Sequence, residues 1–180
     1  MTEIRNRKRN RMIDFDYCSD NLYFVTSCTN DKVCCFGEID DGGMILNELG
    51  EIAEGQWQWL IIKYPYLISH AFVVMPNHIH GVLEINREMI CNDTMGRTGR
   101  DLSLQSQQKI KSLSELMGVY KTTTSKKIHL LGHDDFIWQR SFHDHIIRNT
   151  KYYDKITQYI ATNPENWADD KFYDKSTANQ

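Results

Sequence analysis

Two neighbouring runs of strand-forming residues constrain the fold of this chain most strongly. Residues 67–75 and 78–85 are rich in β-branched and other apolar side chains, and only Pro76 and Asn77 separate them. Two runs of this kind joined by two turn residues are typical of an antiparallel β-hairpin. The sequence therefore predicts a hairpin in the middle of the chain, and the other elements can be placed around it.

A strand and a long helix are predicted before the hairpin. Residues 22–28 are rich in β-branched and aromatic residues and are flanked by polar turn residues, which predicts a strand. After a turn at residues 37–43, apolar residues recur at helical spacing from Met44 to about Tyr64. This pattern predicts an amphipathic helix that ends before Pro65.

Two helices and a strand are predicted after the hairpin. Residues 86–108 lack periodicity and predict a loop. Ser112 and Glu115 have the spacing of a capping box, so a second helix begins at Ser112. Residues 136–147 predict a strand with a turn, and residues 150–162 predict a third helix.

The predicted order is strand, helix, strand, strand, helix, strand. It is the order of the ferredoxin-like split β-α-β fold, an α+β fold in which an antiparallel sheet carries helices packed on one face. Because that fold serves many functions, the function has to be argued from a site. We expect a basic arm at residues 1–16, one domain at residues 17–170 and a tail at residues 171–180.

Composition excludes several classes of protein. With 180 residues, 41% of them hydrophobic, the chain has enough apolar mass for one globular domain. Its apolar stretches are far shorter than the roughly 20 residues of a membrane-spanning helix, so we expect no membrane span. No apolar segment follows the basic N-terminus, so we expect a cytoplasmic protein without a secretory signal. Five cysteines without C-x-x-C spacing indicate reduced thiols.

The charges are distributed unevenly along the chain. The net charge of −3 argues weakly against a nucleic-acid partner. However, residues 5–11 carry five basic residues and no acidic ones, and residues 95–129 carry seven basic residues against two acidic ones. A charge run alone is more typical of a solvated surface than of a binding site. The pattern is therefore compatible with DNA binding without indicating it.

Two histidines form the strongest candidate site. Successive side chains of a strand point to opposite faces, so His78 and His80 share one face of the hairpin while Ile79 points to the other. Two such imidazoles can converge on a divalent cation, although polar residues on a solvated sheet face are the commoner arrangement. Gly81 adds information, because a glycine within a strand often marks the close approach of a ligand or another backbone.

The string Met-Pro-Asn-His-Ile-His-Gly at residues 75–81 resembles the His-hydrophobic-His signature of the REP-associated tyrosine transposases. These proteins are single-tyrosine members of the HUH endonuclease class. The resemblance covers roughly residues 17–170 and continues through an ordered series of motifs. These motifs are at residues 36–39, 46–50, 119–122, 138–140, 145–149 and 159–167.

The resemblance implies a nuclease and strand transferase for single-stranded DNA that recognises hairpin or palindromic DNA and is usually a homodimer. It also implies a divalent metal, Mg²⁺ or Mn²⁺, held by His78, His80 and a third ligand. A tyrosine oxygen attacks phosphorus, which forms a 5′-phosphotyrosine link and leaves a free 3′-OH. Because the link keeps the bond energy, rejoining needs no ATP or other nucleotide cofactor.

The resemblance places the nucleophile on the helix after the hairpin, which makes Tyr120 the first choice among nine tyrosines. A core-facing aromatic explains Tyr120 about equally well, because it lies on the apolar stripe of that helix. Relatives carry a Gln or Asn about one turn beyond the tyrosine as the third metal ligand, where this chain has Thr124. His129 at the helix end is the alternative ligand, and a surface or capping role is its other interpretation. His143 and His145 are second choices.

DNA contacts are expected from basic residues near these motifs. Cations on the second predicted helix and after it could follow a phosphate backbone, and the N-terminal arm could grip a hairpin duplex. The candidates are Arg7, Arg9, Lys121, Lys126, Lys127, Arg140 and Arg148.

Two other functions stay open from sequence. Thr124 and Ser125 stand where relatives carry the nucleophile, which fits a domesticated protein that binds DNA hairpins without catalysis. A ferredoxin-like RNA-binding domain that stacks bases on sheet aromatics is the third interpretation. It does not explain why two histidines share one strand face.

Overall fold

The computed structural model describes residues 20–89 and 110–173 of the chain. The predicted basic arm with Arg7 and Arg9, and most of the predicted loop at residues 86–108, lie outside the described residues. In the described part of the chain, no helix has the length and apolar character that crossing a membrane requires.

Four antiparallel strands form the central sheet in the order β4-β5-β1-β6. The predicted hairpin is present as β4 and β5, and β5 lies inside the sheet because it also pairs with β1. The predicted α+β fold with a ferredoxin-like antiparallel sheet is therefore confirmed. The strands are β1 (Asn21–Cys28), β4 (Leu67–Met75), β5 (His78–Ile85) and β6 (His143–Ile147).

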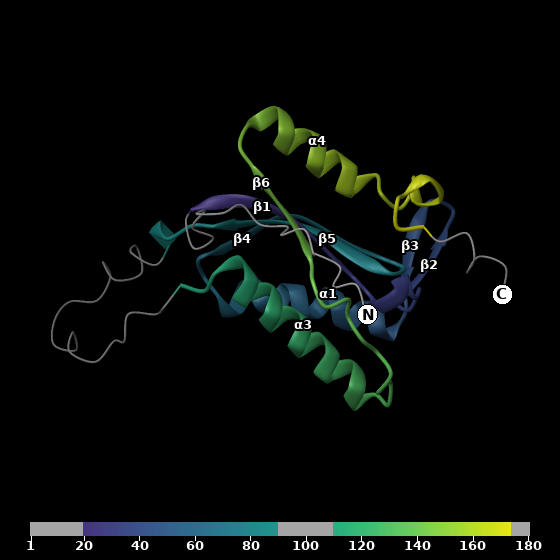
Figure 1. Cartoon of the computed structure of the whole chain (residues 1–180). Helices are drawn as coiled ribbons and strands as arrows, with labels where there is room; N and C mark the ends of the chain where they lie inside the picture. Colours follow the sequence, from purple (N-terminus) through teal and green to yellow (C-terminus); the bar gives the residue numbers. More distant parts are fainter. Residues whose placement is uncertain (1–19, 90–109, 174–180) are drawn as a thin grey trace, which may run out of the picture.

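Helices cover both faces of the sheet, as Figure 1 shows. α1 (Glu48–Lys63) and α3 (Leu113–Leu130) pack against each other on one face, below the sheet in that view. α4 (Thr150–Ala161) lies alone on the opposite face, where it contacts β4 and β5. The sequence predicted helices on one face, and α4 departs from that expectation. Periodicity shows that a helix has an apolar side but not which face of a sheet receives it.

The first helix begins four residues later than predicted. Residues 43–46 form β3 (Gly43–Leu46), which pairs with β2 (Gly37–Asp40) in a separate two-stranded sheet. Asn47 then caps α1, because its side-chain oxygen accepts the backbone N–H groups of Leu49 and Gly50 at 3.0 and 3.1 Å. The apolar residues of β3 fit the helical period as well, so periodicity alone did not separate the two elements.

The side chains of β5 separate two apolar layers. Ile79, Leu83 and Ile85 lie in the main core, between the sheet and the helices α1 and α3. The alternate residues of the strand face α4, where a smaller apolar cluster holds that helix on the sheet. This cluster consists of Val82, Ile147, Ile156 and Ile160.

Gly81 faces the main core rather than the histidines. A Cβ atom at this position would lie 2.4 Å from Cη2 of Trp57. The Trp57 ring is fixed, because it stacks on Phe72 with centroids 4.3 Å apart and its Nε1 donates to Ser69 Oγ at 2.9 Å. The glycine does mark a close approach, but the neighbour is the indole ring of Trp57 and not a ligand.

Gly81→Ala should destabilise the protein, because the added methyl group would overlap the Trp57 ring. We expect the free energy of unfolding to fall by about 2 kcal/mol, within the range of overpacked cores. Urea unfolding measures this change. Gly118→Ala in α3 is the matched control, since nothing lies within 4 Å of its Cβ position and alanine favours the helix. Wild-type stability in Gly81→Ala would contradict the packing described here.

Candidate metal centre

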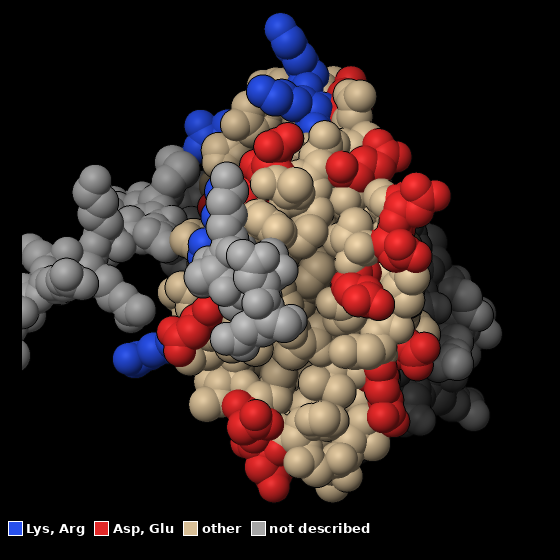
Figure 2. Space-filling model, turned by 90° about the vertical axis from the view of Figure 1, so that its right-hand side faces the viewer, with Lys and Arg blue, Asp and Glu red and all other residues tan. Residues whose placement is uncertain are grey.

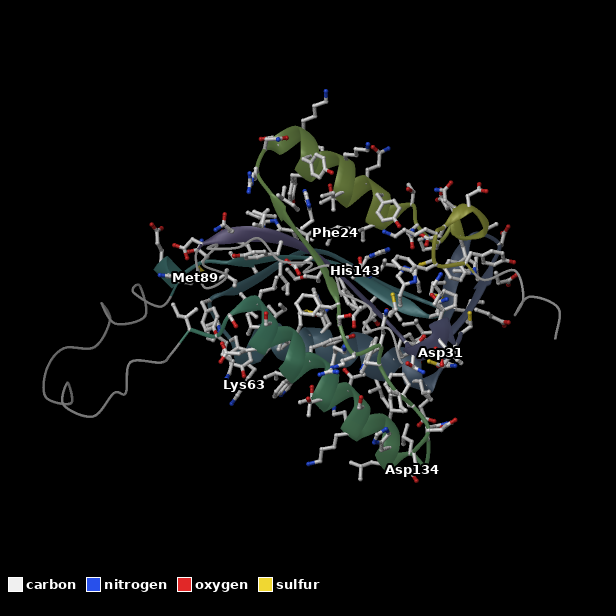
Figure 3. All side chains as sticks on the ribbon, in the orientation of Figure 1. Phe24, Asp31, Lys63, Met89, Asp134 and His143 are labelled. Carbon is white, nitrogen blue, oxygen red and sulfur yellow. The ribbon has the colours of Figure 1, made fainter. Side chains whose placement is uncertain are left out.

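His78 and His80 are brought together on the α4 side of β5. Both residues are fully buried, and their Nε2 atoms are 3.0 Å apart. Phe24 of β1 contacts the His80 ring, with centroids 5.2 Å apart. Figure 3 shows Phe24 in the layer between the sheet and α4. The two nitrogens therefore converge on one point within that layer.

The outer nitrogen of each ring is held by a neighbouring side chain. His78 Nδ1 lies 2.8 Å from Asn77 Oδ1, and His80 Nδ1 lies 2.8 Å from Thr26 Oγ1. The amide nitrogen of Asn77 donates to two carbonyl groups, so its oxygen faces His78 and accepts the Nδ1 proton. This leaves a lone pair on His78 Nε2. Hydrogen bonds to the outer nitrogen orient histidine ligands in the same way in metal sites.

Tyr159 and Asp170 complete the cluster. Tyr159 lies near the end of α4, and its hydroxyl oxygen is 3.2 Å from His80 Nε2. The same hydroxyl donates to Asp170 Oδ2 at 2.8 Å. Ligand atoms of His78, His80 and Asp170 all lie within 4.8 Å of one another. A phenol, two imidazoles and a carboxylate thus meet at one end of α4.

Asn163 lies one helical turn beyond Tyr159 and points into the same cluster. Its Nδ2 donates to Asp170 Oδ2 at 2.9 Å. Its Oδ1 is buried and has no hydrogen-bond partner among the described residues. Because an unpartnered buried polar atom is costly, this oxygen has to be satisfied by a water molecule or by a further ligand.

The segment after α4 covers the histidines. It includes the short 3₁₀ helix η2 (Trp167–Asp169) and continues to Tyr173. The ring of Phe172 lies 4.6 Å from that of His78, and the backbone N–H of Phe172 donates to Asp170 Oδ1 at 2.7 Å. The predicted tail at residues 171–180 therefore begins inside the packed body of the protein.

Burial sets the protonation of this cluster. It lowers the pKa of His78 to about 3, and the positive charges of Lys171 and Lys32 act in the same direction. It also lowers the pKa of His80, with the neighbouring His78 as the second cause. Partial burial, followed by the hydrogen bond to Asp170, raises the pKa of Tyr159 above its ordinary value. At neutral pH the imidazoles are thus neutral, as metal ligands must be, and the phenol keeps its proton.

The donor set fits a divalent cation. Two neutral imidazoles with converging Nε2 atoms, a carboxylate and a buried amide oxygen are nitrogen and oxygen ligands of the kinds that divalent metal ions accept. Without a cation, the two Nε2 atoms can share only one proton, because at 3.0 Å one nitrogen must donate and the other accept. Within residues 20–89 and 110–173, this is the group of His, Cys, Asp or Glu side chains whose geometry could hold a metal ion.

The structure does not bring Tyr120 to this cluster. Tyr120 belongs to α3, across the sheet from the histidines (Figure 1). It is fully buried, its hydroxyl donates to the Ala53 carbonyl at 3.1 Å, and its ring meets Trp57 edge-on. Burial raises the pKa of this phenol above its ordinary value. The choice of Tyr120 as nucleophile is therefore corrected, and its role is that of a core aromatic.

His129 does not reach the cluster either. It lies at the end of α3, where its Nε2 contacts the carbonyl oxygen of Phe136 at 2.9 Å. This contact ties the helix to the segment that follows it. The choice of His129 as third metal ligand is corrected accordingly, because among the described residues it is Asp170, and not His129, that lies beside His78 and His80.

The second histidine pair lies on the edge strand β6. His143 and His145 are exposed and stand opposite Thr26 and Phe24 of β1. The ring of His145 lies 5.2 Å from that of Tyr152, on α4. Neither belongs to the group of metal-ligating side chains among the described residues.

The predicted DNA-contacting residues that the structure describes do not surround the cluster. α3 carries three of them on the far side of the sheet, and two flank β6. Figure 2 views the molecule from the end with β2 and β3, where acidic side chains are widespread and basic ones gather at the top and one edge. DNA contact stays a prediction for Lys121, Lys126, Lys127, Arg140 and Arg148.

Sequence reasoning missed Tyr159, Asn163 and Asp170 as site residues. A usable signal was present, since Asn163 follows Tyr159 by four residues, just beyond the end of the third predicted helix. This is the spacing that the resemblance implies between the nucleophile and an amide ligand. Asp170 has no comparable signal, because only the path of the segment after α4 brings it beneath Tyr159.

The chain was compared with family models, curated proteins and solved structures. No family model matches the chain. A protein of Haemophilus influenzae, described as uncharacterized, is 30% identical over 170 residues, which cover 94% of each chain. The two chains belong to one family. Among solved structures, a REP-associated tyrosine transposase bound to a REP hairpin matches with a TM-score of 0.53 and 19% identity, over 86% of this chain and 72% of that chain.

This chain has the fold of the REP-associated tyrosine transposases. The resemblance in residues 75–81 is thus confirmed at the level of the fold. Within this transposase fold, the histidines lie on an interior strand and the tyrosine of the cluster lies on α4.

Acidification should destabilise the protein through its buried histidines. The folded pKa of His78 is about 3 and the ordinary value is 6.5, so the unfolded chain binds more protons between these values. The contribution to stability is therefore complete above about pH 6.5 and is lost as the pH falls toward 3. We expect a loss of about 1 kcal/mol per pH unit from His78 in this window, measured by urea unfolding in EDTA.

Two variants test the source of this pH dependence. His78→Gln should reduce the slope, because it removes one buried group that must gain a proton on unfolding. His145→Gln, at an exposed position of the same sheet, should keep the wild-type slope. Equal slopes for His78→Gln and the wild type would contradict this explanation.

Proposed function

We propose that this protein is a metal-dependent endonuclease and strand transferase for single-stranded DNA, with Tyr159 as its nucleophile. The observation that carries the proposal is the position of the Tyr159 hydroxyl, 3.2 Å from His80 Nε2. A tyrosine beside converging metal ligands can attack a phosphate held at the same point. The transposase fold and the motif at residues 75–81 support this function.

His78, His80 and Asp170 are the proposed ligands of the divalent cation, Mg²⁺ or Mn²⁺, and Asn163 Oδ1 is a further oxygen donor. When bound, the cation polarises the scissile phosphate and offsets the negative charge that develops on it. Asn77 and Thr26 keep the two imidazoles in place through their outer nitrogens. The ligand geometry is therefore largely formed before DNA binds.

Asp170 is the proposed acceptor of the Tyr159 proton. The hydroxyl group already donates to Asp170 Oδ2 at 2.8 Å, so the proton moves along an existing hydrogen bond. The phenol oxygen forms a bond to phosphorus, and the bond from phosphorus to the 3′ oxygen breaks. The 3′ oxygen leaves with a proton from solvent, and the 5′ phosphate remains linked to Tyr159.

The reverse step joins DNA ends. A 3′-OH of another strand attacks the phosphotyrosine and gives its proton to solvent as its oxygen bonds to phosphorus. The bond from phosphorus to the tyrosine oxygen breaks, and Asp170 returns the proton to that oxygen. No energy source is needed, because the covalent link to Tyr159 replaces the phosphodiester bond that was broken. Asp170 thus acts as base in cleavage and as acid in joining.

DNA with a hairpin is the proposed substrate. The solved transposase that shares the fold is described as bound to a REP hairpin. Binding of a hairpin by the basic N-terminal arm, and assembly into a homodimer, are further parts of the proposal. The cytoplasmic location stays a prediction from composition.

The alternative function, hairpin binding without catalysis, loses the observation that favoured it. That observation was the presence of Thr124 and Ser125 where a nucleophile was expected on the second predicted helix. Both residues belong to α3, across the sheet from the metal ligands, so their identity does not affect the cluster around Tyr159. The complete set of Tyr159, two histidines and Asp170 favours an enzyme.

Incubation with Mn²⁺ and single-stranded DNA that contains a hairpin should produce a covalent protein–DNA adduct. Tyr159→Phe should abolish the adduct, because the attacking oxygen is removed. Tyr120→Phe and Tyr152→Phe should retain it, since Tyr120 lies in the core and Tyr152 is exposed on α4, the helix that carries Tyr159. A denaturing gel with labelled DNA measures the adduct, and peptide mapping locates it.

An adduct that survives in Tyr159→Phe and is lost in Tyr120→Phe would overturn the assignment of the nucleophile. Hairpin binding without any adduct from the wild-type protein would favour the non-catalytic alternative. A chelator should stop adduct formation while circular dichroism shows the same folded state.

A further inference from the structure

We propose that Lys32 and Lys171 form a second phosphate site, which binds a backbone phosphate of the DNA strand next to the phosphate that Tyr159 attacks. This inference rests on the proposed function, because it takes the cluster around Tyr159 as the place of cleavage. Lys32 and Lys171 are far apart in sequence, and neither lies in the two basic clusters of the chain.

The two lysines meet beside the candidate metal centre. Their ammonium groups lie 5.7 and 4.7 Å from the ring centroid of Phe172. That ring is in turn 4.6 Å from the ring of His78 and 5.8 Å from the ring of His80. A single aromatic side chain therefore separates both cations from the metal ligands. A strand that crosses the cluster would pass both lysines within the length of a nucleotide or two.

The backbone holds Lys32 in a strained conformation at this place. It ends the 3₁₀ segment η1 (Asn30–Lys32), and both Asp31 and Lys32 have left-handed φ values of 50° and 57°. Thr29 Oγ1 closes the turn by donating to the carbonyls of Val33 and Asn77 at 2.9 and 3.0 Å. Two successive left-handed residues other than glycine are costly, and such strain is concentrated at functional sites.

Other hydrogen bonds connect this turn to the histidines. The side-chain amide of Asn77 donates to the carbonyl oxygens of Lys32 and Phe172 at 3.1 and 3.0 Å, while its oxygen faces His78 Nδ1. The Lys32 ammonium group donates to the Lys171 carbonyl at 3.2 Å, which fixes the two segments against each other. Asn77 thus links the position of Lys32 to that of a metal ligand.

The charged side chains around Phe172 favour the binding of an anion. Lys32 and Lys171 bring two positive charges that lower the pKa of His78, and Asp170 is a carboxylate that raises the pKa of His80 against the effect of burial. Between the described residues, neither ammonium group forms an ion pair with a carboxylate. A bound divalent cation would add two more positive charges. The negative charges of Asp170 and of the single scissile phosphate would then not neutralise the cation and both lysines. A neighbouring phosphate of the same strand supplies the missing negative charge.

Salt dependence of binding tests the site directly. The probe is fluorescent oligothymidylate, titrated in EDTA at several NaCl concentrations so that binding is measured without cleavage. Lys32→Gln and Lys171→Gln should each weaken binding about tenfold, the usual worth of a charged hydrogen bond. Each should also reduce the slope of log affinity against log salt by about 0.7, the value for one phosphate on a single strand.

Lys63→Gln is the matched control. Lys63 ends α1 and lies at the opposite end of the molecule from Asp31 in Figure 3, so its loss should leave affinity and slope unchanged. Lys171→Arg, unlike Lys171→Gln, should keep the wild-type slope of log affinity against log salt, because the guanidinium group keeps the positive charge. Wild-type slopes in both Lys32→Gln and Lys171→Gln would overturn the second phosphate site.

Neutral phosphate analogues then locate the contact along the strand. A methylphosphonate at one position beside the cleavage point should slow adduct formation by the wild type, and should not slow the Lys32→Gln, Lys171→Gln double variant further. An equal effect in both proteins would contradict the proposal. If no adduct forms but the lysine variants alter the salt slope, the proposed cleavage fails while the phosphate site stands.

Discussion

The alternation of side chains along β5 is the constraint on which the site depends. Ile79, Leu83 and Ile85 enter the main core, so His78 and His80 must point to the other face. β5 pairs with β4 and β1, and both neighbours fix its register. If β5 shifted by one residue against its neighbours, both imidazoles would enter the main core and lose their hydrogen bonds to Thr26 and Asn77. The cost of that shift strongly disfavours any other register.

The layer on the α4 side is built differently from the main core. Its apolar cluster is small, and polar contacts at both ends of α4 supplement it. At one end, Tyr153 contacts His70, which in turn bonds to Glu84 on β5 at 2.7 Å. At the other end, Tyr159 joins the histidine pair to Asp170. The tyrosine proposed as nucleophile is therefore positioned by a helix that a small apolar cluster and polar contacts at both ends attach to the sheet.

Local patterns predicted most of the strands and helices, because turns, helix caps and periodicity depend on residues that are close together in the sequence. The hairpin at Pro76 and Asn77 and the capping box at Ser112 are examples. The face that each helix covers was not predictable in this way. α3 and α4 both have an apolar side, and the sequence favoured Tyr120 on α3, whereas the sheet places Tyr159 of α4 on the face that carries the histidines. Asp170 reaches the site only through the fold of the segment after α4.

The most direct test of the candidate centre is an anomalous diffraction measurement on crystals that contain Mn²⁺. We expect one peak between His78 Nε2, His80 Nε2 and the Asp170 carboxylate, next to the Tyr159 hydroxyl, with the peak lost in His80→Ala. A well-occupied Mn²⁺ ion elsewhere, with none at His78 and His80, would contradict the central claim that these residues form the metal centre of the protein.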